Sequence, residues 1–208
     1  MPNRTFLGFL SLMTLPTTAM AGAPWSEFDI ESDGVEVFTI TSADVNNDGR
    51  LDILAGTQNL NIQIHLNAGD GTFELQDDVI ALDNDPMALA TGDIDGDGDI
   101  DIAYGCRGDA FVGWAANNGD GTFSARTDLW QAASQPTKLV LVDADEDGDL
   151  DLAHQTHNTG VLAIAMNDGS GGFGTPTTLV ASGVKDFVFA NVGEFGSSAP
   201  DVMYVTTA

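Results

Sequence analysis

The feature that most restricts the fold of this chain is an internal repeat of about 50 residues. Three acidic segments align without gaps: ADVNNDGRLDILAG at 43–56, GDIDGDGDIDIAYG at 92–105 and VDADEDGDLDLAHQ at 142–155. A second motif, N-x-G-x-G-x-F, recurs with a spacing of 50 at 67–73, 117–123 and 167–173. Because both motifs recur at a spacing of about 50 residues, the chain is an array of similar units.

Each unit contains four short segments with the composition of β-strands. In the first unit they are LDILAGT, NIQIHLN, FELQDDVIAL and MALATGDI, in which apolar and β-branched residues are interrupted by Gly, Asn and Asp turns. No window shows a sustained helical period. Four strands per unit at this period predict an all-β fold, a β-propeller of four-stranded blades.

We count about four repeats, of which the last is incomplete. Its acidic block is degenerate, with Asn191 and Asp201 at the first and last positions and two extra residues between them. At the other end, WSEFDIE at 25–31 resembles an isolated fourth strand. The predicted array therefore consists of one strand, three full blades and two further strands.

The acidic blocks crowd like charges together. Five aspartates occupy alternate positions from Asp93 to Asp101. At a separation of about 6 Å, two carboxylates repel by roughly 0.7 kcal/mol in water and about 3 kcal/mol near a protein surface. Such a segment is either an acidic turn that water solvates or a loop that holds a cation.

The spacing within each block matches the inner part of a calcium-binding loop. Side-chain oxygens stand at positions 1, 3, 5 and 9, position 6 is a glycine where the chain must turn sharply, and position 7 offers a backbone carbonyl. The predicted ligands are Asp44, Asn46, Asp48, Arg50 and Asp52; Asp93, Asp95, Asp97, Asp99 and Asp101; and Asp143, Asp145, Asp147, Asp149 and Asp151. Arg50, Asp99 and Asp149 are predicted to bind through their carbonyl oxygens only.

These blocks are not EF-hands. Position 12 of an EF-hand is a bidentate Glu, but here it is Ala55, Tyr104 or His154, and the flanking segments have the pattern of strands. We therefore expect about three Ca²⁺ sites with a mainly structural role. After each block, we expect residues such as Leu51 and Ile53 to face the core, with the closing Asp52 facing the loop.

The N-terminal segment predicts export. Residues 1–21 combine a short basic start, an apolar stretch and the small-x-small sequence Ala19-Met20-Ala21, as in a secretory signal peptide. A retained membrane anchor is the alternative. The mature chain, 22–208, would form the repeat domain, with no further membrane span. Cys106 is the single cysteine, so no disulfide within the chain is available, and a buried thiol is expected.

The charge of the chain excludes two classes of partner. The formal net charge is −26, and the acidic residues are 26 Asp against 6 Glu. Such a chain repels nucleic acids and anionic membranes. The preference for the shorter carboxylate favours turns and metal ligands over a general effect on solubility.

The three acidic blocks, each followed by an apolar strand and an N-x-G turn, resemble FG-GAP/VCBS-type repeats. This resemblance implies the calcium-binding propellers of integrin α-subunit heads and of many exported bacterial proteins. It also implies that the side chains of Asp44, Asn46, Asp48 and Asp52, and their equivalents, are calcium ligands. Propellers of this family usually have seven blades, so the repeats here would form part of a ring or an open array.

The predicted function is recognition of an extracellular protein or glycan, as in adhesion, by a non-enzymatic module. Trp114, Trp130 and Tyr104 are candidate stacking surfaces, although a lone aromatic residue in a strand is more often part of the core. The alternative is a carbohydrate-active hydrolase or lyase, or an accessory domain of one. His154 and His157 could bind a transition metal there, but we expect both to be exposed loop residues. Self-association through the edges of an incomplete blade is a further expectation.

Overall fold

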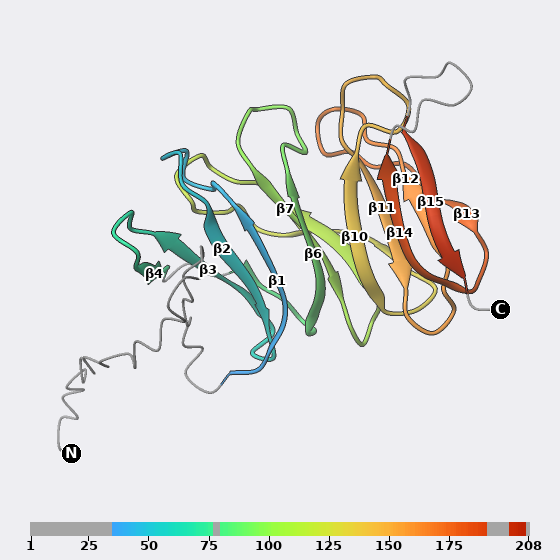
Figure 1. Cartoon of the computed structure of the whole chain (residues 1–208), viewed down its shortest axis with the longest axis horizontal. Helices are drawn as coiled ribbons and strands as arrows, with labels where there is room; N and C mark the ends of the chain where they lie inside the picture. The colour runs from blue at the N-terminus through green and yellow to red at the C-terminus, as the bar shows by residue number, and fades with distance from the viewer. Residues whose placement is uncertain (1–34, 77–79, 191–199, 207–208) are drawn as a thin grey trace, which may run out of the picture. The chain divides into compact units, whose positions relative to one another are not determined.

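The computed structural model describes residues 35–76, 80–190 and 200–206, in which every regular element is a β-strand. The strands form four antiparallel sheets that follow one another along the chain (Figure 1). The described residues contain no helix with the length and apolar character that a membrane span needs.

Three of the sheets have the same four-strand order. The first contains β1 (Val37–Ala43), β2 (Asp52–Thr57), β3 (Asn61–Asn67) and β4 (Phe73–Leu75), with β5 (Ile80–Ala81) also paired to β3. The second contains β6 (Pro86–Gly92), β7 (Asp101–Cys106), β8 (Phe111–Ala115) and β9 (Thr127–Gln131). The third contains β10 (Pro136–Val142), β11 (Asp151–Thr156), β12 (Leu162–Ala165) and β13 (Thr177–Val180). The predicted all-β architecture of four-stranded units is confirmed.

The fourth sheet repeats the first two strands, β14 (Val184–Ala190) and β15 (Asp201–Thr206). Its register is that of the other sheets: Ala190 pairs with Asp201 as Ala43 pairs with Asp52. Asp201 therefore occupies the closing position of the degenerate block, as predicted. Asn191 and the segment 25–31 lie outside the described residues.

The apolar core consists of three clusters, each between two consecutive sheets. The first joins Leu54 and Ile64 to Ile102, and the second joins Trp114 of the second sheet to Leu152 of the third. The third lies between the third and fourth sheets. Strands β7 and β11 are buried on both faces because a sheet packs against each side of them.

The sheets approach closely at one repeated point. A Cβ atom on Gly56 would lie 2.9 Å from Pro86 Cγ, and one on Gly105 would lie 2.7 Å from Pro136 Cβ. Glycine is therefore needed where the second strand of one unit meets the proline that opens the next unit. This contact explains why a proline recurs after 50 residues, at Pro86 and Pro136.

Basic side chains connect neighbouring sheets. The Arg107 guanidinium lies 5.1 Å from the ring centroid of Phe38 in β1. Lys138 in β10 donates to Asp186 Oδ1 (2.6 Å) and to the Phe187 carbonyl (2.7 Å) in β14. In a chain with so few cations, these contacts place positive charge at the junctions between units.

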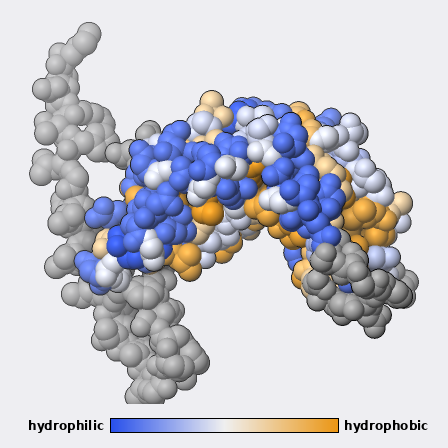
Figure 2. Space-filling view, turned by 90° about the horizontal axis from the view of Figure 1, so that it is seen from above, coloured by the Kyte–Doolittle hydropathy of each residue, from blue (hydrophilic) through white to orange (hydrophobic). Residues whose placement is uncertain are grey.

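The three acidic loops lie at one end of the sheets, where β1, β6 and β10 end (Figure 1). Figure 2 shows this end from above, with hydrophilic residues covering much of it. The strands β1 and β6, and likewise β6 and β10, are in contact. The fold therefore brings segments about 50 residues apart in the sequence to neighbouring positions on one face.

Candidate metal centre

Each acidic loop turns through two residues in the left-handed region. The glycine at position 6 has φ of 84° at Gly49, 95° at Gly98 and 100° at Gly148. Position 4 is also left-handed, with φ of 59° at Asn47 and 67° at Glu146. Glycine, and to a lesser degree Asn, adopts this conformation at low cost. These residues allow each loop to turn sharply between its opening and closing aspartates.

The opening aspartate of each loop also orders the backbone. In the second loop, Asp93 accepts hydrogen bonds from the Gly96 N–H (2.8 Å) and the Gly98 N–H (3.0 Å). In the first loop, Asp44 Oδ2 accepts from the Gly49 N–H (2.7 Å). These bonds hold the loops in shape without cancelling the charge of the carboxylates.

The closing aspartates are buried, and Leu51, which was expected to face the core, is exposed. Asp52, Asp101 and Asp151 are 0% exposed, whereas Leu51 is 61% exposed. The reason is that each carboxylate accepts two backbone N–H groups. Asp52 accepts from Val45 (3.0 Å) and from Asn67 (2.8 Å), and the other two closing aspartates have equivalent bonds. Burying a carboxylate costs desolvation free energy, which burying a leucine does not. The two charge-assisted hydrogen bonds to each aspartate offset part of that cost.

Two of the loops bring three carboxylates close together. One oxygen from each of Asp93, Asp95 and Asp101 lies within 4.8 Å of the others, and the same holds for Asp143, Asp145 and Asp147. Oxygens that bind one Ca²⁺ at about 2.4 Å can lie at most about 4.8 Å apart, so both sets fit such an ion. The remaining predicted ligands of these loops, Asp97, Asp99, Asp149 and Asp151, are outside these sets.

Each set also contains a buried oxygen without a hydrogen-bond donor. Asp95 Oδ1 and Asp143 Oδ1 have no partner, although neither atom is accessible to solvent. A buried carboxylate oxygen is stable only if a donor or a cation compensates it. The donor sets therefore fit a cation such as Ca²⁺, which prefers carboxylate oxygens.

Burial, together with neighbouring carboxylates, raises the pKa values of three aspartates in these loops. Burial raises the pKa of Asp101 to about 6, and burial also raises the pKa of Asp151. Burial and the neighbouring Asp97 raise the pKa of Asp95. A cation among these groups would favour their charged forms and reverse the shifts.

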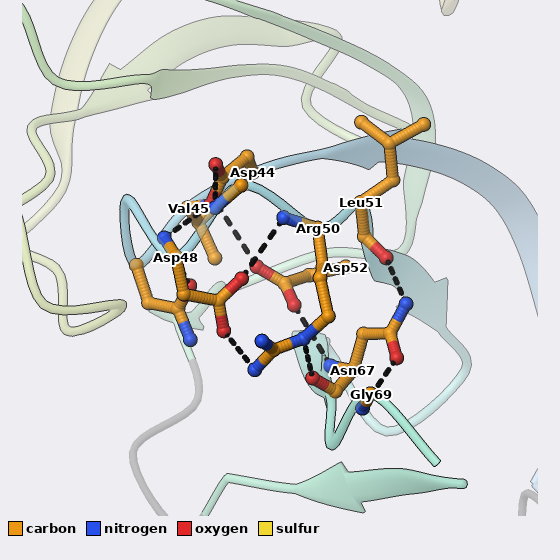
Figure 3. A network of polar contacts seen from close by, with 10 residues as sticks. Asp44, Val45, Asp48, Arg50, Leu51, Asp52, Asn67 and Gly69 are labelled. Carbon is orange, nitrogen blue, oxygen red and sulfur yellow. Dashed lines mark hydrogen bonds and ion pairs between the residues drawn. The ribbon is translucent and has the colours of Figure 1, made fainter. Parts of the chain in front are cut away.

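The first loop differs from the other two. The Arg50 side chain folds back over its own loop, forms an ion pair with Asp48 Oδ2 and donates from Nε to the Asn67 carbonyl (2.8 Å; Figure 3). Position 3 is Asn46, which supplies an amide oxygen in place of a carboxylate. The nine residues of this loop therefore have a formal charge of −2, compared with −5 and −6 in the second and third loops.

The position 7 residue of the second loop, Asp99, directs its side chain to the first loop. Asp99 Oδ1 accepts a hydrogen bond from Asn47 Nδ2 of the first loop (2.7 Å). This contact engages the Asp99 side chain between the two loops, and its role as a carbonyl ligand stays a prediction. The contact also joins the first two loops at their exposed tips.

The sequence did not indicate three asparagines that close these loops. The backbone N–H groups of Asn67, Asn117 and Asn167 donate to the closing aspartates at 2.8, 2.8 and 2.9 Å. Each is the first residue of an N-x-G turn and appears in the sequence as an ordinary turn residue. Their identity at a spacing of 50 was the signal that could have distinguished them.

The other candidate residues are mostly buried. His154, expected in an exposed loop, lies within β11 and is 3% exposed, because its ring packs 5.8 Å from that of Trp130. His157 is exposed, as expected. Tyr104 and Trp114 are buried in the core, and Cys106 is buried with its pKa raised to about 12 by burial.

Comparisons with known proteins agree with the repeat and with the fold. The family described as FG-GAP-like repeat matches residues 44–104 and 93–154. No curated protein matches the chain.

Similar solved structures include BBS1N in complex with ARL6DN, with 16% identity, a TM-score of 0.55 and coverage of 87% of this chain and 50% of that one. A lectin from Agrocybe aegerita, described as recognising non-reducing terminal N-acetylglucosamine, has 24% identity, a TM-score of 0.48 and coverage of 69% and 38%. The chain thus spans half or less of the length of these structures. The succession of four-stranded sheets is that of a β-propeller.

Proposed function

This chain belongs to the FG-GAP-like repeat family, which matches more than half of its residues, and we propose that it is an exported, calcium-binding recognition module. The observation that carries the calcium proposal is the pair of three-carboxylate sets in the second and third loops, each with a buried oxygen that lacks a donor. Export is supported by the sequence of residues 1–21 alone.

In this proposal, calcium is mainly structural. Each loop connects the first strand of a sheet to the second, and in the second loop the closing Asp101 belongs both to the three-carboxylate set and to β7. A cation there offsets the repulsion among the aspartates and holds the turn against the strand. Binding free energy then contributes directly to the stability of the fold.

The three loops would not bind calcium equally. The second and third loops have the higher negative charge, whereas Arg50 already pairs with Asp48 in the first loop. A cation entering the first loop must displace this guanidinium or bind beside it. We therefore propose two tighter sites and one weaker site among the three predicted.

Calorimetric titration of residues 22–208 tests these assignments. We expect Asp95→Ala to remove one tight calcium site per chain and Asp145→Ala to remove the other, since each takes one carboxylate from a set of three. Asp70→Ala is the matched control, because it removes an acidic residue from an N-x-G turn, outside the loops. Equal stoichiometry in all four proteins would contradict the assignment.

The proposed partner is an extracellular protein or glycan, bound without turnover. The family resemblance supports recognition, and the burial of His65 and His154 in the sheets makes two of the three histidines unsuitable for a hydrolase or lyase. A panel of polysaccharides tests the alternatives, because the calcium-loaded protein should bind a glycan and should not cleave it. Release of reducing ends by the protein would overturn the non-enzymatic assignment.

A further inference from the structure

The asparagines that open the N-x-G turns make contacts that extend beyond their own units. Asn117 and Asn167 are 3% and 6% exposed. Within its own unit, Asn117 donates from Nδ2 to the Ile100 carbonyl (2.9 Å), and its Oδ1 accepts from the Gly119 N–H (3.0 Å). These bonds connect the turn to the acidic loop of the same sheet.

The second donor of each amide reaches the preceding unit. Asn117 Nδ2 donates to the Val45 carbonyl (2.7 Å), and Asn167 Nδ2 donates to the Ile94 carbonyl (2.7 Å). Val45 and Ile94 are the position 2 residues of the first and second loops, and they are 0% and 1% exposed. Because these carbonyls are buried, loss of the amide would leave each without this donor.

The closing aspartates bind the N–H groups of the same two residues, Val45 and Ile94. The Val45 N–H donates to Asp52, and the Ile94 N–H donates to Asp101 (2.8 Å). Asp101 in turn accepts from the Asn117 backbone N–H (2.8 Å). A continuous buried path of hydrogen bonds therefore leads from Asp52 through Val45 and Asn117 to Asp101, and onward through Ile94 and Asn167 to Asp151.

We propose that Asn117 and Asn167 are positioning residues that couple the three acidic loops, so that a cation in one loop raises the affinity of its neighbour for the same cation. Position 2 lies between two predicted ligands, at positions 1 and 3, and the two bonded peptide groups on either side of it connect it to both. A loop ordered by calcium presents its carbonyl, or its closing aspartate, in the geometry that the neighbouring loop requires. The coupling is reciprocal, as linkage demands. The proposal rests on the calcium binding proposed above.

The chain contains a matched control for this role. Asn67 makes the same bonds within its unit: its N–H donates to Asp52, its Nδ2 to the Leu51 carbonyl (3.1 Å), and its Oδ1 accepts from Gly69 (2.9 Å). Within the described part of the chain it has no hydrogen bond to the preceding unit. Asn67→Ala therefore removes the structural contribution of the turn and leaves both junctions intact.

The test measures calcium uptake loop by loop, using hydrogen exchange of peptides that cover 44–51, 93–100 and 143–150 across a calcium series. Asp95→Ala disables the second loop. With native asparagines, we expect Asp95→Ala to raise the calcium concentration at which the first and third loops are half protected. The expected rise is about fivefold, the lower end of the range of affinity changes between coupled sites. With Asn117→Ala added, the shift at the first loop should disappear while the shift at the third loop remains. With Asn167→Ala the pattern should reverse, and with Asn67→Ala both shifts should persist.

Equal shifts at the first loop with and without Asn117 would overturn the coupling, as would the absence of any shift when the second loop is disabled. Uptake of no calcium by the native protein is a distinct result, which overturns the proposed function itself. If Asn117→Ala does not fold, Asn117→Asp serves instead, because it retains the acceptor for the Gly119 N–H and lacks the two donated bonds.

Discussion

Removing calcium with a chelator should lower the thermal midpoint of residues 22–208 by roughly 10–20 °C. At a free calcium concentration about 100 times the dissociation constant, each occupied site stabilises the folded state by about 2.7 kcal/mol. Two tight loops therefore contribute about 5 kcal/mol, and for a domain of this size 1 kcal/mol corresponds to about 2–4 °C. Differential scanning calorimetry with and without calcium measures the difference.

Two controls separate binding from charge screening. Sodium chloride at matched ionic strength tests the general effect of salt on a chain with a net charge of −26. Magnesium at the same concentration should stabilise less, because it requires a smaller and stricter octahedral site. Melting curves that coincide in calcium and in chelator would rule out the structural role.

His154 should make the protein less stable as the pH falls from about 6.5 to 4. Burial lowers the pKa of this imidazole to about 4, and its Nδ1 has no hydrogen-bond partner. The unfolded chain binds a proton at the ordinary pKa of about 6.5, so it holds more protons than the folded chain between these values. The contribution of the neutral imidazole is therefore complete above pH 6.5 and is lost as the pH falls to 4, an effect on the order of 3 kcal/mol.

Comparison of the native protein with His154→Phe isolates this effect. Phenylalanine does not titrate and keeps an aromatic ring beside Trp130 and Phe173. In urea unfolding at pH 7 and pH 4, the variant should lose less stability on acidification than the native protein does. His157→Phe is the control for the same replacement at an exposed histidine outside β11. Parallel losses in all three proteins would show that His154 stays neutral in the unfolded chain or charges freely in the folded one.

The repeat made most of the fold predictable. Strands alternate with Gly and Asp turns at a fixed period, so the four-strand unit, its boundaries and the equivalence of Asp201 with Asp52 could be inferred from spacing alone. Spacing also indicated which aspartates share a loop. These features depend on local chemistry, which repeats together with the sequence.

Features that depend on contacts between units could not be predicted in the same way. Leu51 was expected in the core but is exposed, and Asp52, which was expected to face the loop, is fully buried because two backbone N–H groups hold its carboxylate. His154 follows an acidic loop in the sequence, yet it is covered by Trp130 from the neighbouring sheet. The pairing of Arg50 with Asp48 depends on a side-chain conformation that composition does not specify.

The cross-unit asparagine bonds have a consequence for how such a gene can change. The donor on Asn117 and the acceptor on Val45 recur, 50 and 49 residues later, as Asn167 and Ile94, with the same separation of 2.7 Å. A tandem duplication of one unit would therefore bring its own donor to the unit before it and its own acceptor to the unit after it. Recombination in whole multiples of the period preserves every junction, whereas a deletion of half a unit leaves a buried carbonyl unpaired. Selection would thus allow the array to lengthen or shorten in steps of one blade.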